Sequence, residues 1–328
     1  MTDGTQVYGL GVDIEDGRLQ FTLATEQGEV DVDDYLRQQG VPTMRDRIPV
    51  LAFGANVSPS SLKSKFGKIG RPDGLVVPTV YATLPGHDVV WSGGPGVNGN
   101  FIAILYQGEE TEATDVQVGI NFLTPEQALV MHATELAYDL SAVEVEVAGQ
   151  PVRAYYYVGV DNVYLRDGRP VAIAGVKAEG RDLPASTTGA LLDELLADQA
   201  TLQPIYQEYP DLADVTDSDG YIRYMRDLLV KEGGAARLAL KRRMQDALAV
   251  SGHAKRTTTD TDQSQRVSWA NPSTLATFGQ QERGKHHNDI YLLPGQHIPA
   301  WPDADARQGV LRAVGRHLSR MRDAEPRP

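Results

Sequence analysis

The strongest constraint on the fold is a succession of short apolar or alternating segments between residues 47 and 165. Their lengths, and the glycine-rich or acidic loops between them, are typical of β-strands. Only two helix starts interrupt them, near Ser58 and Thr124. We therefore predict an α+β fold with a small, closed or strongly curved sheet. The segments lie at 49–53, 76–90, 101–106, 116–122, 143–147 and 152–160.

Both helix starts carry capping signals. Ser58 is well placed as an N-cap, with Pro59 at the first helical position, where the missing N–H is not needed. Thr124-Pro125-Glu126-Gln127 has the pattern of a capping box with proline at the first position. The sequence thus places a strand, a tight turn at Gly54 and a helix N-terminus in direct succession. The apolar face of the second helix consists of Leu129, Val130, Ala133, Leu136 and Ala137.

An N-terminal β extension is predicted over residues 1–46. Two alternating segments meet at the turn residues Asp16 and Gly17, and a short helix follows near residues 32–37. The α+β unit is then predicted to occupy residues 47–180.

The character of the chain changes to helical periodicity after about residue 180. We predict a helical region over 181–250, with helices at 187–202 and 219–250. Residues 251–266 are polar and nearly devoid of apolar side chains, which predicts a flexible linker. The C-terminal segment 267–328 is predicted to end in an amphipathic helix rich in arginine.

Composition excludes several classes of function. The 328 residues contain no cysteine, so thiol nucleophiles, thiolate metal sites and disulfides are excluded. The formal charge of −13 opposes non-specific attraction to nucleic acid or anionic lipid. No apolar run approaches the roughly 20 residues that cross a bilayer, and the start of the chain is acidic. We therefore expect a cytoplasmic protein with neither a nucleic-acid nor a membrane partner.

Several segments in order resemble the γ-glutamyl cyclotransferase family. Residues Val50–Val57, with Phe53-Gly54-Ala55-Asn56-Val57 at their end, resemble its Tyr-Gly-Ser-Asn-Leu signature, which also ends a strand and precedes a helix. Gly119–Glu126 is similar to the family's strand leading into a Leu-Thr-Pro-Glu helix start. Met131–Leu136 then falls where the family has Leu-Asp-x-x-Glu-Gly, and 143–158 resembles the strand pair that follows. Order and approximate spacing agree over residues 48–160.

The resemblance implies a small mixed β-barrel of the cyclotransferase type and a γ-glutamyl substrate. It implies that Glu135 is the acid/base residue and that the loop after the first barrel strand holds the substrate. A strand that ends in Gly-x-Asn at a helix start also presents N–H groups suited to a carboxylate or a developing oxyanion. The loop candidates for substrate binding are Phe53, Gly54, Ala55, Asn56 and Val57.

Lactam formation requires little beyond one carboxylate. The substrate's α-ammonium must lose a proton and attack the γ-carbonyl, and the leaving amine must gain a proton. Glu135 can perform both transfers if burial raises its pKa toward neutrality. Because the attack is intramolecular, its rate comes from proximity, so neither a metal nor a cofactor is expected. The predicted products are 5-oxoproline and a free amine.

Four positions depart from the family pattern: Phe53 replaces tyrosine, Ala55 replaces serine, His132 replaces aspartate and Leu136 replaces glycine. They motivate a second hypothesis, a catalytically inactive barrel that serves as a binding or scaffold module. A third is γ-glutamylamine transfer or hydrolysis in the same pocket. For Glu135 the plain alternative is a solvated residue beside an apolar helix stripe. For the loop it is an ordinary strand-to-helix turn.

Other motifs are less specific. Alternation directs at least one of Tyr155, Tyr156 and Tyr157 inward, and Tyr156 is included as a substrate-binding candidate. Gly93–Gly99 has no βαβ unit after it and is predicted to be a flexible loop near the barrel mouth. His132 and Glu135 lie three apart, but a pair without a third ligand does not predict a metal site.

Overall fold

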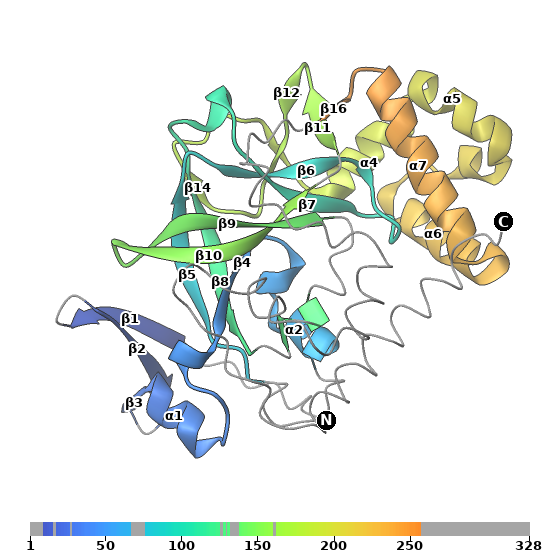
Figure 1. Cartoon of the computed structure of the whole chain (residues 1–328). Coiled ribbons are helices and arrows are strands. Elements are labelled where there is room, and N and C mark those ends of the chain that lie inside the picture. The colour runs from blue at the N-terminus through green and yellow to red at the C-terminus, as the bar shows by residue number, and fades with distance from the viewer. Residues whose placement is uncertain are drawn as a thin grey trace, which may run out of the picture. The chain divides into compact units, whose positions relative to one another are not determined.

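The computed structural model describes residues 9–15, 18–26, 28–66, 76–124, 127–128, 130–131, 138–159 and 162–256. They form two compact units (Figure 1). The first contains the described residues up to Leu84 and from Gln117 to Val158, and the second contains Pro85–Val116 and Gly159–Arg256. Residues 85–116 and 159–180, which the sequence analysis assigned to one domain with the barrel, therefore group with the helical region.

A closed barrel of five strands is the centre of the first unit. The strands follow the order β8-β4-β10-β9-β5 and return to β8. β4 and β10 pair in parallel, whereas β4 pairs antiparallel with β8, and β5 with β9. The expected α+β fold with a small mixed barrel is thus confirmed. The strands are β4 (Ile48–Ala52), β5 (Thr79–Pro85), β8 (Asp115–Leu123), β9 (Tyr138–Val147) and β10 (Gln150–Gly159).

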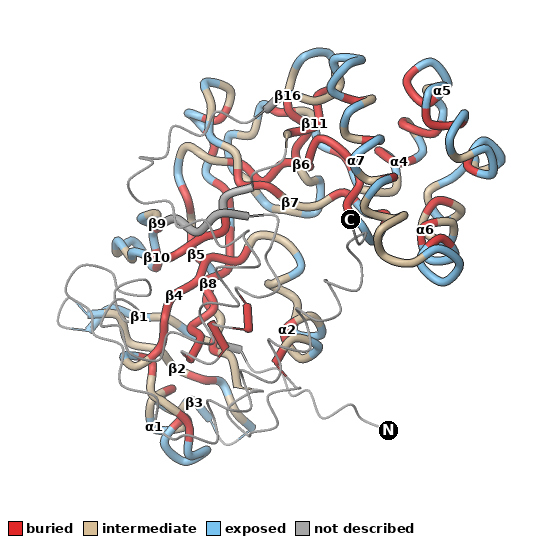
Figure 2. The backbone as a smooth tube through the Cα atoms, turned by 45° about the vertical axis from the view of Figure 1, so that its right-hand side comes forward, coloured by how far each residue is buried: buried red, intermediate tan, exposed pale blue. Residues whose placement is uncertain are grey.

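Every residue of β4 is buried, which explains its uninterrupted apolar sequence (Figure 2). A strand with side chains covered on both faces has no reason to alternate. The 76–90 segment, expected as one strand, is divided by a turn at Gly86, which has a φ of 70°. Its last residues, 88–90, are the start of β6 (Asp88–Pro95), which belongs to the other unit.

The N-terminal part is a three-stranded antiparallel sheet with one helix. It comprises β1 (Gly9–Glu15), β2 (Arg18–Thr25), β3 (Gly28–Asp31) and α1 (Val32–Gln38). Asp31 starts α1 by accepting a 2.9 Å hydrogen bond from Asp34 N. Phe21 of β2 meets Phe122 of β8 edge to face, with ring centroids 5.5 Å apart. The extension therefore packs on the barrel.

β6 is the central strand of the second unit. It pairs with β7 (Phe101–Tyr106), β11 (Asn162–Arg166) and β13 (Ala172–Ile173). Short strands extend this sheet: β12 (Arg169–Pro170), β15 (Ala185–Ser186) and β16 (Ala254–Arg256). β14 (Ala178–Glu179) pairs with the start of β8. β16 lies in the predicted 251–266 linker, so this part of the linker is a strand; residues 257–266 and the segment 267–328 lie outside the described residues.

Four helices complete this unit: α4 (Thr188–Ala197), α5 (Gln199–Glu208), α6 (Ser218–Glu232) and α7 (Gly234–Val250). The single helix expected over 187–202 is two, because Asp198 caps α5 by accepting from Thr201 N. The helix expected over 219–250 is broken at Gly233, whose φ is 86°. Of the described helices, none is long and apolar enough to cross a membrane.

Of the segment 93–99, predicted as a loop, residues 96–99 lie between β6 and β7, but Gly93 and Gly94 have a packing role instead. Gly93 and Gly94 lie in β6. A Cβ on Gly93 would lie 2.6 Å from Asn162 Cβ, and one on Gly94 would lie 2.9 Å from Gln245 Cγ of α7. Small residues are therefore required where β11 and α7 approach β6 closely. The core around them includes Trp91, Phe101, Tyr164, Leu191, Leu195, Met225, Leu240, Met244 and Leu248.

Candidate functional site

The predicted substrate loop follows β4 directly. Phe53 and Gly54 turn the chain into a single 3₁₀ turn, Ala55–Val57, in which Val57 N donates to Gly54 O over 3.1 Å. α2 (Pro59–Phe66) begins immediately after it, and Leu62 N donates to Ser58 O over 3.0 Å. Ser58 thus occupies the N-cap position, with Pro59 first in the helix, as the sequence predicted.

Asn121 of β8 holds this loop against the sheet. Its Nδ2 donates to Asn56 O over 2.9 Å, and its Oδ1 accepts from Thr79 Oγ1 over 2.7 Å. The side chain is fully buried, at 0 % exposure. A buried amide needs partners at both ends, and here both ends are used. One side chain therefore connects β8, the start of β5 and the loop.

The loop makes a second contact with the same face of the sheet. Val57 lies over Gly119, two residues before Asn121: a Cβ on Gly119 would lie 3.5 Å from Val57 Cγ2. Gly119 pairs with Ala52, the last residue of β4. The chain therefore turns back over the strands that it has just left.

Strand register shows which tyrosines share this face. Tyr155 of β10 pairs with Val50, and Val50 pairs with Asn121. Paired residues project to the same face, and neighbours along a strand alternate. Tyr155 therefore lies on the face of Asn121, as does Tyr157, whereas Tyr156, the predicted candidate, projects to the opposite face. All three are buried, and burial raises the pKa of Tyr155 against the opposing effect of Arg153.

The capping box predicted at Thr124 is confirmed. Gln127 N donates to Thr124 Oγ1 over 3.2 Å, and Thr124 N donates to Gln127 Oε1 over 2.9 Å. Residues 127–128 and 130–131 are helical. Thr124, the capping residue, thus follows directly on the last residue of β8.

Arg47, which belongs to none of the sequence motifs, contacts this helix start. The residue is only 5 % exposed, and its guanidinium donates to Pro42 O, Val76 O and Phe122 O over 2.9, 3.1 and 3.1 Å. Gln127 Oε1 lies 3.5 Å away. In the sequence, Arg47 is simply a charged residue immediately before an apolar strand. Residues at such positions are usually solvated, so the sequence did not indicate that Arg47 is buried.

Glu135 lies outside the described residues, together with His132 and Leu136. The described helical residue that precedes them is Met131, which is buried and accepts a 3.2 Å hydrogen bond at Sδ from Lys65 Nζ of α2. α2 and the helical residues 130–131 thus meet. Among the side chains that the structure describes, no group of three or more His, Asp or Glu residues could hold a metal ion.

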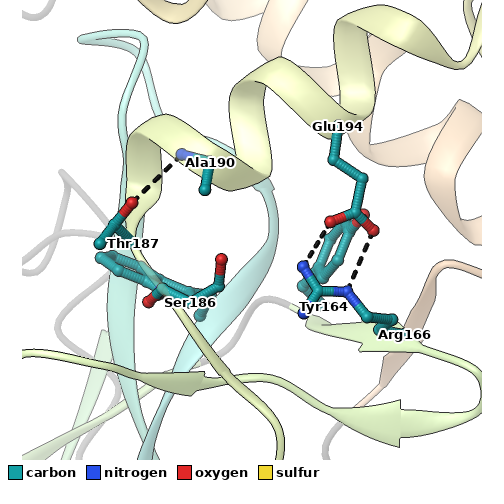
Figure 3. A network of polar contacts seen from close by, with 7 residues as sticks. Tyr164, Arg166, Ser186, Thr187, Ala190 and Glu194 are labelled. Atoms are coloured by element: carbon teal, nitrogen blue, oxygen red, sulfur yellow. Dashed lines mark hydrogen bonds and ion pairs between the residues drawn. The ribbon is translucent and has the colours of Figure 1, made fainter.

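A separate polar network in the second unit attaches α4 to β11 (Figure 3). Glu194 accepts from Tyr164 Oη over 3.3 Å and forms a two-point ion pair with Arg166. Burial, followed by the nearby Glu194 carboxylate, raises the pKa of Tyr164. Thr187 caps the same helix through Ala190 N over 3.2 Å. Since each group is engaged within the network, we assign it a structural role.

Comparison of the chain with family models, with curated proteins and with solved structures finds no match.

Proposed function

We propose that this chain is a γ-glutamyl cyclotransferase-like enzyme, which converts a γ-glutamyl amine or peptide to 5-oxoproline and a free amine. The observation that carries the proposal is the loop Phe53–Val57. It follows a strand of a closed barrel and is fixed against the neighbouring strand by the buried Asn121. The residues that resemble the family signature therefore form an ordered, anchored segment. An ordinary surface turn would not require a buried side chain to hold it.

In the proposed reaction the loop binds the γ-glutamyl group and Glu135 moves the protons. The carboxylate takes a proton from the α-ammonium, the freed amine attacks the γ-carbonyl, and the C–N bond to the leaving amine breaks. The proton on Glu135 then passes to that amine, which regenerates the carboxylate. The attacking nitrogen loses its second proton as the lactam forms, and this proton also passes to the released amine, which departs as an ammonium ion. A loop already fixed in position lowers the barrier because less motion must be frozen when the substrate binds.

The direct test is mass spectrometry for 5-oxoproline. The purified protein and its Glu135→Gln variant are incubated with γ-glutamyl dipeptides, γ-glutamyl polyamines and glutathione. We expect product from the wild type and a loss of about 100-fold or more in the variant, because general acid–base groups contribute that much. Glu144→Gln, at an exposed position of β9, is the matched control and should retain full activity. Full activity of Glu135→Gln would exclude the role assigned to Glu135.

The inactive-barrel alternative is supported by Phe53 and Ala55, which bring no hydroxyl groups to the loop. It predicts heat of binding for a stable γ-glutamyl analogue in titration calorimetry, without turnover of any substrate in the panel. Detection of glutamate in place of 5-oxoproline would instead indicate γ-glutamyl transfer or hydrolysis.

A further inference from the structure

We propose that Asn121, with Thr79 behind it, is the positioning residue of the substrate loop: it sets the orientation of the Asn56–Val57 peptide and polarises the loop through it. This inference rests on the proposed function for its catalytic consequence. Its structural part, the anchoring of the loop, stands on the hydrogen bonds of Asn121.

The direction of the hydrogen bonds follows from the chemistry of the partners. The Asn56 carbonyl can only accept, so the amide nitrogen of Asn121 must face it. The amide oxygen then faces Thr79, whose hydroxyl donates. The Asn56 carbonyl therefore selects the orientation of the Asn121 amide, and the Thr79 hydroxyl holds the amide there by satisfying its oxygen.

The chain of donors continues into the loop through peptide groups. The peptide that carries the Asn56 carbonyl also carries the Val57 N–H, which donates to Gly54 O over 3.1 Å. The peptide group that contains the Gly54 carbonyl also contains the Ala55 N–H. Hydrogen bonds in series polarise one another, by an estimated 10–30 % per bond. The series of hydrogen bonds from Thr79 through Asn121 therefore makes the Ala55 N–H, in the centre of the proposed substrate loop, a stronger donor.

The position of Asn121 is hard to explain by packing. Across the sheet, Asn121 pairs with Val50, which in turn pairs with Tyr155. Along β8, the nearby residues Ile120, Phe122 and Leu123 are apolar and buried. An aliphatic side chain would fill the same place without the need to satisfy two polar ends. The loop carbonyl supplies the reason for an amide at this point.

Two substitutions remove different hydrogen bonds of this series. Asn121→Asp keeps the acceptor for Thr79 but places an acceptor against the Asn56 carbonyl, and we expect a loss of about 100-fold in kcat/KM because small displacements of binding groups cost that much. Thr79→Val removes only the hydroxyl that donates to Asn121 Oδ1 and should raise KM about tenfold, the equivalent of one hydrogen bond. Thr79→Ser restores the hydroxyl and should restore KM. Thr83→Val, in the same strand, is the matched control and should leave KM unchanged.

Hydrogen exchange at the Val57 amide tests the anchoring without any substrate. Thr79→Val should accelerate this exchange about tenfold relative to wild type and Thr83→Val. If the wild type turns over no substrate, the proposed function fails, while exchange still decides whether Asn121 anchors the loop. Unchanged Val57 exchange together with unchanged KM in Thr79→Val and Asn121→Asp would overturn the inference. A fall in melting temperature with unchanged KM would show that the pair is merely structural.

Discussion

Arg47 is a buried cation whose partners are mainly backbone carbonyls. It connects the residues before β4, the end of β8 and the capping box at Thr124. A buried guanidinium is tolerated because its fan of N–H donors can satisfy several acceptors at once. Lysine cannot reproduce this arrangement, since its donors all sit on a single nitrogen.

We expect Arg47→Met to lower the free energy of unfolding by about 2–4 kcal/mol, because several carbonyls lose a charged donor together. Arg47→Lys should recover only a small part of this. Arg45, whose side chain is 85 % exposed two residues earlier, provides the control: Arg45→Met should change stability by no more than about 0.5 kcal/mol. Urea denaturation measures all three. Equal losses for Arg47→Met and Arg45→Met would contradict the role assigned to Arg47.

The carboxylate of Asp198 is predicted to give the second unit a stability that depends on pH. It accepts from Thr201 Oγ1 over 2.5 Å and from Thr201 N over 3.1 Å, and His253 Nε2 lies 3.4 Å away. These interactions, the Thr201 hydroxyl foremost, lower the pKa of Asp198 in the folded state. A lowered pKa stabilises the fold above the unfolded value of about 4, and this contribution is lost as pH falls through the folded value.

Asp198→Ala should therefore destabilise the protein by about 1 kcal/mol at pH 7, as for other N-caps. The difference from wild type should begin to shrink below about pH 4, where the unfolded carboxylate takes up a proton, and should disappear at lower pH as the folded carboxylate is protonated. Thr201→Val removes the largest contribution and should move this transition to higher pH. Urea denaturation over a pH series provides the measurement. A difference that stays constant with pH would exclude the ionised carboxylate as its source.

At the scale of elements, the approach of β11 and β16 to β6 depends on Gly93. A Cβ there would lie 2.6 Å from Asn162 Cβ and 2.9 Å from Ala254 Cβ. Gly93→Ala is therefore expected to cost about 1–3 kcal/mol, the usual range for overpacking. Gly175, which has no atoms within 4 Å of a built Cβ, is the control, and Gly175→Ala should be close to neutral. Melting temperatures by circular dichroism distinguish the two; equal shifts would contradict the packing argument.

The elements that the sequence predicted well are those fixed by local chemistry. The capping box at Thr124, the proline-initiated α2 and the hairpin of β1 and β2 depend on residues close together in the chain. The misread features depend on distant partners. Glycines in a loop and glycines beneath a helix look alike, so Gly93 and Gly94 were assigned to a loop.

The candidate site divides in the same way. The loop Phe53–Val57 could be predicted from its own residues, because strand, turn and helix start are consecutive. Its anchor Asn121 could not, because the contact spans 65 positions of the chain. Nor could the face of each tyrosine be chosen before β10 was known to pair with β4.

At the scale of the whole molecule, neither compact unit is a continuous piece of chain. The division falls at 84/85, 116/117 and 158/159. The range 47–180 that the sequence suggested as a domain therefore contains β6, β7 and β11 but lacks α4–α7. In the structure these strands contribute Trp91, Phe101 and Tyr164 to a core that is otherwise made largely by the helices.

A fragment ending at residue 180 should consequently fail to form the second unit, since large aromatic side chains of its sheet would face water. We expect it to bind the dye ANS strongly, to lose near-ultraviolet dichroism and to aggregate. A fragment ending at residue 256 retains every helix that the structure describes in that core, and it should show a cooperative urea transition. A soluble, cooperatively folding 1–180 fragment would contradict this interpretation: it would mean that β6, β7 and β11 can be covered without α4–α7.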